Sequence, residues 1–92
     1  MHQLIIPTPL RKFTGGLGVF ESDASDVRSL IGALVSAHEG LKPHILDDSG
    51  ALRSFIRIYV GDEDIQELQG EDTPLATASE VSIIPAIAGG IR

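Results

Sequence analysis

The 92-residue sequence contains no cysteine. That absence excludes disulfides, thiolate metal sites, iron–sulfur clusters and cysteine nucleophiles. A small domain without disulfides suits a reducing cytoplasm, which is where we expect this protein to act. The sequence also lacks an apolar run of the roughly 20 residues that span a membrane, and its N-terminus lacks the features of a secretory signal. We therefore expect no membrane association.

Basic residues are scarce as well: 7 Lys and Arg stand against 13 Asp and Glu, giving a net charge of −6. Binding to nucleic acid is disfavoured, because neutralising phosphates needs clustered Lys and Arg. The three histidines, His2, His38 and His44, lack the spacing of metal ligands. No bound metal or other cofactor is predicted.

Carboxylates are concentrated in the second half of the chain, where no Lys or Arg lies between Ile58 and Ile91. Their spacing does not match a calcium-binding EF-hand loop, which also needs a central glycine. We interpret them as a solvated acidic face, with a docking surface for a basic partner as the alternative. The residues are Asp62, Glu63, Asp64, Glu67, Glu71, Asp72 and Glu80.

Apolar residues make up 42% of the chain, which is enough for one small folded core. Alternation of apolar and polar residues predicts two strands joined by a long hairpin loop, and two further strands later in the chain. A very short strand is expected at Ile65. The Thr14-Gly15-Gly16 segment is interpreted as a turn rather than a phosphate loop, because a strand follows it. The predicted strands cover residues 3–6, 17–21, 54–60 and 80–84.

One helix is predicted, with Ser25 as its N-cap and Gly40 as its stop. Apolar residues recur at helical spacing from Val27 to Val35, and His38 ends this stripe. Residues 41–53 are interpreted as a connector that places His44 in a loop. One helix across a small mixed sheet gives an α+β, β-grasp-like fold.

The C-terminal segment is the most informative part of the sequence. The last predicted strand ends at Pro85 and is followed by small residues that include Gly89 and Gly90. Glycines have no side chain, so such a tail can pass through a narrow channel into another protein's active site. The alternative is an ordinary frayed terminus.

Two stretches, Phe55–Ile65 and Glu80–Gly90, resemble the MoaD/ThiS family of ubiquitin-like sulfur carriers, and within it the CysO-type carriers of cysteine biosynthesis. The early Pro7-Thr8 pair and the Thr14–Gly16 turn also fit that type. The resemblance implies a ubiquitin-like β-grasp domain over residues 1–86 and a tail over residues 87–92.

The resemblance also implies a mechanism in which the chain is a protein co-substrate and not an enzyme. An adenylating enzyme of the ubiquitin-activating type would use ATP to activate the carboxylate of Gly90. A sulfur donor would convert the adenylate to a thiocarboxylate, and a synthase would accept the sulfur. Cysteine, molybdopterin, thiamin and related sulfur metabolites all remain open as the product.

Partner recognition in this family uses an apolar patch on the open face of the sheet, beside the tail. By resemblance, Ile84 and Pro7 occupy the patch, Ile5 shares its facing, and Tyr59 and Arg57 lie at its rim. The contacts expected to continue the patch toward the glycines are Pro85, Ile87 and Ala88. The alternative is that these are ordinary exposed apolar side chains.

The sequence departs from the family pattern because Ile91 and Arg92 follow Gly90. Two extended residues move the terminal carboxylate by about 7 Å, and a β-branched side chain cannot imitate glycine in a tight channel. We expect a metal-dependent protease of the JAMM type to cleave after Gly90. If the extension persists, carrier activity is lost.

Two other functions remain open from the sequence. The chain could be a ubiquitin-like modifier, conjugated through Gly90 to lysines of other proteins. It could also be an interaction domain that keeps its tail and never uses it.

Overall fold

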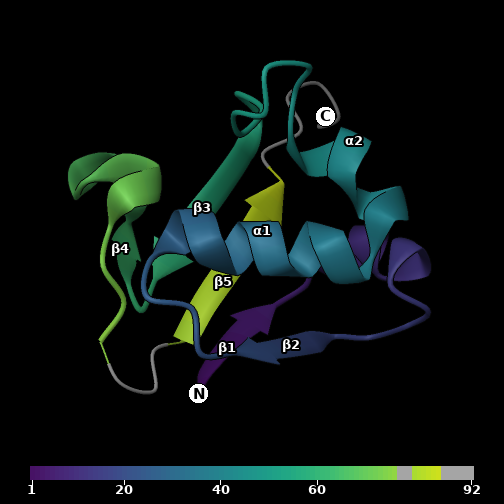
Figure 1. Ribbon diagram of the computed structural model, residues 1–92, viewed down its shortest axis with the longest axis horizontal. Helices are drawn as coiled ribbons and strands as arrows, with labels where there is room; N and C mark the ends of the chain where they lie inside the picture. Colours follow the sequence, from purple (N-terminus) through teal and green to yellow (C-terminus); the bar gives the residue numbers. More distant parts are fainter. Residues whose placement is uncertain (77–79, 86–92) are drawn as a thin grey trace.

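The computed structural model describes residues 1–76 and 80–85. Five strands form one mixed sheet in the order β2-β1-β5-β3-β4 (Figure 1). The central strands β1 and β5 are parallel, and every other neighbouring pair is antiparallel. The strands are β1 (His2–Ile5), β2 (Val19–Ser22), β3 (Ile56–Val60), β4 (Glu63–Asp64) and β5 (Glu80–Pro85).

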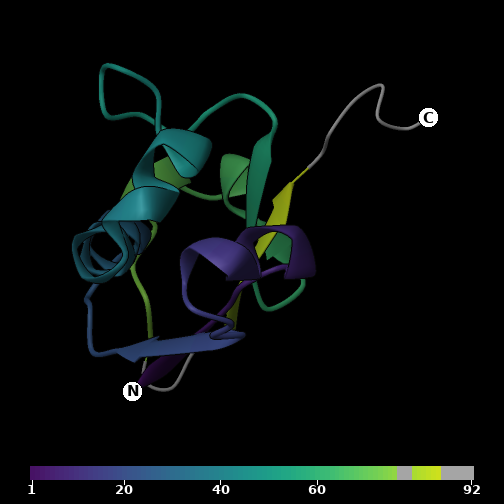
Figure 2. The same ribbon diagram turned by 90° about the vertical axis from the view of Figure 1, so that its right-hand side faces the viewer.

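The helices all connect strands. They are α1 (Val27–Ala37) and α2 (Lys42–Ile45), with short 3-10 turns η1 (Thr8–Phe13), η2 (Glu39–Leu41), η3 (Ile65–Glu67) and η4 (Gly70–Asp72). Figures 1 and 2 show α1 and α2 on the same side of the sheet. The described helices are too short to cross a membrane. The α+β, β-grasp arrangement expected from the sequence is confirmed.

Helix α1 follows the predicted apolar stripe but not its predicted boundaries. Its N-cap is Asp26, whose carboxylate accepts a hydrogen bond from the Ser29 backbone N–H at 2.7 Å, so the prediction of Ser25 is wrong. The Ser25 carbonyl instead accepts from the Leu75 N–H at 2.9 Å. The helix ends at the C-cap His38, before Gly40, which lies in η2. Pairing with a distant segment therefore set where the helix begins.

The connector predicted over residues 41–53 contains a structured element. Leu41 and Ile45 are fully buried, and the single turn of α2 brings both into the core. This also corrects the prediction of a loop at His44, which lies within α2 and stacks on the Phe13 ring with centroids 4.0 Å apart. The segment is too short for its apolar residues to show a helical period.

The other differences concern strand ends. β2 begins at Val19 rather than residue 17, and β4 is the pair Glu63–Asp64. Ile65 lies in η3 and is buried, so the short strand predicted there ends one residue earlier, at Asp64. The segment that follows Ile65 contains the rest of η3 and all of η4. The predicted alternation of buried and exposed side chains along the strands is confirmed, and Leu4, Ile58 and Ile83 lie in the core.

Candidate functional site

The sheet face opposite α1 carries a set of apolar side chains, which we call the open-face patch. Register joins them across four strands: Ile5 pairs with Val19 on one side and Ser82 on the other, and Ser82 pairs with Tyr59. Successive side chains of a strand point to opposite faces, so these residues share the face opposite the core. The patch comprises Ile5, Pro7, Val19, Tyr59 and Ile84.

The patch is accessible to a partner. Ile84 is 44% exposed and Val19 is 40% exposed, the two largest values among the apolar side chains of the strands. Ile5, Pro7 and Tyr59 are half-buried. Apolar surface gathered on one face at adjoining register positions marks a site of association more strongly than the same residues scattered singly.

The structure places Ile5, Pro7, Tyr59 and Ile84 together, as the sequence predicted, and adds Val19. Val19 was missed because nothing in its local sequence shows which face it takes. Its pairing with Ile5 across the β1–β2 hairpin assigns it to the patch. A hairpin register drawn from the predicted strands could have found it.

Arg57, predicted at the rim of the patch, and Pro85, predicted to continue the patch toward the glycines, lie on opposite faces of the sheet. Arg57 pairs with Ile84 across β3 and β5, and its Nη1 lies 3.3 Å from the Asp64 carboxylate and 3.2 Å from the Gln66 side-chain oxygen. Pro85 pairs with Ile56, a core residue, so it has the register of the helix side of the sheet. Pro85 therefore does not belong to the open-face patch.

The chain beyond Pro85 starts from the middle of the sheet, because β5 lies between β1 and β3. β1 and β5 are parallel, so Pro7 and Ile84 lie at the same edge of the sheet, where the tail begins. The predicted tail contacts Ile87 and Ala88, the reactive Gly90 with Gly89, and the Ile91-Arg92 extension lie outside the described residues. So does the predicted boundary between residues 86 and 87.

The glycine-rich turn and His38, two other candidates for a chemical role, have structural roles. Gly15 and Gly16 have φ of 68° and 92°, and β2 rather than a helix follows them, so the turn interpretation is confirmed. His38 is the C-cap of α1 and packs edge-on against Phe20. Across the part of the chain that the structure describes, no three His, Asp or Glu side chains gather to hold a metal ion.

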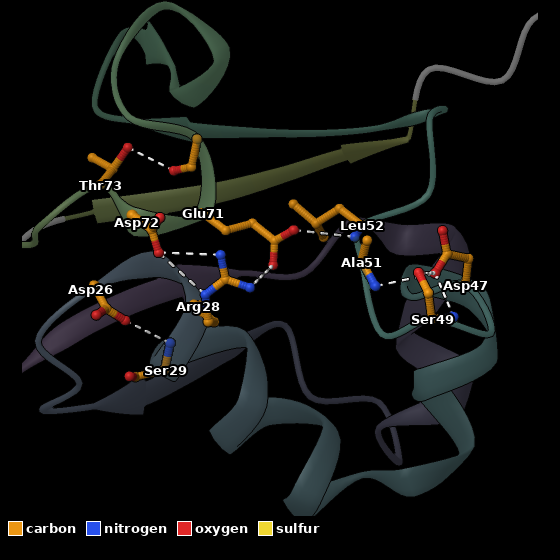
Figure 3. Close-up of polar contacts among 11 residues, drawn as sticks. Asp26, Arg28, Ser29, Asp47, Ser49, Ala51, Leu52, Glu71, Asp72 and Thr73 are labelled. Carbon is orange, nitrogen blue, oxygen red and sulfur yellow. Dashed lines mark hydrogen bonds and ion pairs between the residues drawn. The ribbon is translucent and has the colours of Figure 1, made fainter.

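A group of charge interactions lies away from the patch, on the helix side (Figure 3). Arg28 of α1 reaches Asp72 at 3.1 Å and Glu71 at 3.5 Å, and the other Glu71 oxygen accepts from the Leu52 N–H at 3.3 Å. The hydrogen bond and charge of Asp72 raise the pKa of Arg28. These contacts tie α1 to η4 and to the loop before β3, so part of the acidic face serves the fold.

Comparisons with known proteins agree with this geometry. Residues 4–90 match the ThiS family, and the chain belongs to that family. The match ends at Gly90, so Ile91 and Arg92 lie beyond the family's pattern.

Among characterised relatives, the sulfur carrier protein CysO of Mycobacterium tuberculosis is 37% identical over 87 residues, covering 92% of this chain and 94% of that protein. The crystal structure of the Amycolatopsis orientalis BexX/CysO complex contains a chain with 33% identity and a TM-score of 0.87, covering 98% of this chain and all of that one. The crystal structure of Mycobacterium tuberculosis CysO gives 32% identity and a TM-score of 0.84, covering 95% and 100%.

Proposed function

We propose that this chain is a sulfur carrier protein that transfers sulfur from a thiocarboxylate at Gly90. The observation that carries the proposal is the family match over residues 4–90, which ends at the second glycine. The name of the 37% identical relative, a sulfur carrier, supports the same role. In this proposal the carrier is a protein co-substrate and not the catalyst, as the sulfur carrier relatives support, and the open-face patch beside the start of the tail is its docking surface.

The proposed chemistry takes place on the tail, in the active site of a partner. A carboxylate is a poor electrophile, so an adenylating enzyme of the ubiquitin-activating type joins the Gly90 carboxylate to AMP and releases pyrophosphate from ATP. A sulfur donor then attacks the acyl carbon, and AMP leaves with the electron pair of the broken bond. The thiocarboxylate sulfur then attacks an electrophilic carbon of an acceptor held by a synthase and displaces a leaving group. Water cleaves the remaining acyl–sulfur bond, which leaves the sulfur on the acceptor and returns the Gly90 carboxylate. The open-face patch binds each partner in turn.

The extension must be removed before this chemistry can begin. With Ile91 and Arg92 present, the chain's own carboxylate is two residues beyond Gly90, a reach of about 7 Å for extended backbone. We assign the cleavage after Gly90 to a JAMM-type metalloprotease, in the cytoplasm where ATP is available. Every described strand and helix lies within residues 2–85, so the cleavage removes none of them.

Intact-protein mass spectrometry on the chain from its native cell tests this proposal. We expect loss of Ile91-Arg92 and, in part of the population, replacement of one terminal oxygen by sulfur. Purified chains ending at Gly90 and at Arg92 form the matched pair for ATP–pyrophosphate exchange with the native adenylating enzyme, and only the shorter one should react. A native chain that always retains Arg92, even beside that enzyme and ATP, would overturn the carrier mechanism.

A further inference from the structure

The turn between η1 and β2 presents one exposed apolar side chain, that of Leu17. Leu17 is 38% exposed and lies two residues before Val19, an exposed member of the open-face patch. Between them, Gly18 lies opposite the buried Ile6, whose backbone N–H donates to the Gly18 carbonyl at 2.9 Å. Successive side chains of an extended segment point to opposite faces of a sheet, so Leu17 shares the open face with Val19.

Leu17 completes a row of side chains that crosses the sheet at the edge where β5 ends. Continued by two positions, the β1–β2 register brings Leu17 opposite Pro7, and the β1–β5 register brings Pro7 opposite Ile84. Ile84 in turn pairs with Arg57 on β3. The row therefore runs from Leu17 at its outer end to Arg57, along the edge from which the chain continues toward Gly90.

The backbone that carries Leu17 is held by hydrogen bonds within the turn. Thr14 is 5% exposed, and its hydroxyl donates to the carbonyls of Arg11 and Leu17 at 3.0 Å and 2.9 Å. The Gly16 N–H donates to the Arg11 carbonyl at 2.8 Å, and the Leu17 N–H donates to the Thr14 carbonyl at 3.3 Å. Because Gly15 and Gly16 adopt the positive φ that this turn requires, the position of Leu17 is set before any partner binds.

The length of the tail limits how far away a partner that uses Gly90 can be. Residues 86–90 reach at most about 17 Å beyond β5 when extended. Leu17 lies beside β2, two strands from β5, which is about 10 Å across the sheet. A protein that holds the Gly90 carboxylate in its active site therefore comes within reach of Leu17. In the proposed function, that protein is the adenylating enzyme.

The chemistry of Leu17 favours an apolar surface on this partner. Removing apolar surface from water favours association, and a side chain on a fixed backbone loses less conformational entropy on binding. A polar partner surface at the same place would lose its water without gaining a hydrogen bond, which is unfavourable. The outer end of the row thus distinguishes between partners by the polarity of the surface that they present there.

We propose that Leu17 is a specificity-determining contact that packs against an apolar surface of the adenylating enzyme. The inference rests on the proposed function, because it takes that enzyme to be the protein that receives Gly90. Thr14 and Gly16 are positioning residues, which act through the turn that holds Leu17.

ATP–pyrophosphate exchange with the native adenylating enzyme tests the proposal, using chains that end at Gly90. Leu17→Asp should raise the KM for the carrier by at least about tenfold, with kcat changed less than about twofold, because a carboxylate would be buried against an apolar surface. Leu17→Met keeps an apolar side chain of similar size and should change the KM by less than about twofold. Gly16→Ala retains Leu17 but strains the turn, and should raise the KM by an intermediate factor.

Leu68→Asp provides the matched control, since Leu68 is also 38% exposed but follows η3, away from the open-face patch. It should change the KM by less than about threefold. A purely structural role for Leu17 would lower the unfolding temperature as the KM rises, whereas we expect Leu17→Asp to shift that temperature by no more than about 4 °C. Equal rises in KM for Leu17→Asp and Leu68→Asp, or for Leu17→Asp and Leu17→Met, would overturn the assignment.

The two proposals fail in different ways. An unchanged KM for Leu17→Asp, with an active wild-type chain and a raised KM for Ile84→Asp, overturns the role of Leu17 alone. No exchange with the wild-type chain ending at Gly90 overturns the carrier function and, with it, the contact that depends on it.

Discussion

Ile83 and Ile84 are identical neighbours on β5 with opposite surroundings. Ile83 is 2% exposed and packs in the core beneath the helices, whereas Ile84 is 44% exposed on the open face. The same contrast runs along β1, where Leu4 is fully buried and Ile5 is half-buried. The two faces use the same residue types for different purposes: one stabilises the fold, and the other is available for binding.

Truncating the two isoleucines separates these purposes most clearly. Ile83→Ala should lower the free energy of unfolding by about 2–5 kcal/mol, because it removes buried methylene groups and leaves a cavity. Ile84→Ala should change it by no more than about 0.5 kcal/mol, as expected for an exposed site. Urea unfolding of both variants measures the difference, and equal losses would mean that the two faces are not distinct.

A charge on the open face tests binding without disturbing the core. Ile84→Asp should raise the KM in the pyrophosphate-exchange assay by at least about tenfold, because a carboxylate would be buried against an apolar partner surface. Leu68→Asp is the matched control: Leu68 is 38% exposed but follows η3, away from the patch. A similar rise in KM for both variants would indicate general charge repulsion rather than a partner contact at Ile84.

The helix layer makes a smaller, pH-dependent contribution to stability at the N-cap of α1. The backbone hydrogen bond from Ser29, and then its side chain, lower the pKa of Asp26. A lowered pKa stabilises the fold above the ordinary aspartate pKa near 4, and this stability is lost as the pH falls through the lower, folded value. Asp26→Ala should therefore reduce the unfolding temperature at pH 7 by a few degrees.

Asp26→Asn separates the charge from the cap. Asparagine caps helices about as well as aspartate, so stability at pH 7 should be nearly unchanged while the loss between pH 4 and pH 2 becomes shallower. Thermal unfolding across this pH range provides the measurement. An identical acid profile for Asp26→Asn and the unaltered chain would show that the Asp26 carboxylate does not contribute to it.

The sequence was most informative where a pattern is local. The stripe from Val27 to Val35 defined the body of α1, and alternation along residues 80–84 separated Ile83 from Ile84. Gly89 and Gly90 predicted the tail as the reactive part, because residues without side chains can enter a narrow channel. The family match then extended to the second of them.

Prediction failed where a distant segment decides the outcome. Ser25 was displaced as N-cap because its carbonyl is engaged by Leu75, about fifty residues away in the chain. α2 is a single turn, too short to show a period, and it exists because Leu41 and Ile45 have a core to enter. Pro85 was predicted to continue the patch toward the glycines, and its register with Ile56 places it on the other face of the sheet from Ile84.

The order of strands and helix and the two faces of β1 and β5 were therefore determined by the sequence, since each depends on residues a few positions apart. Val19 joins Ile5 only because the hairpin pairs the two strands in that register. Such contacts depend on register between segments, which no local period encodes. The open-face patch is thus a property of the folded sheet.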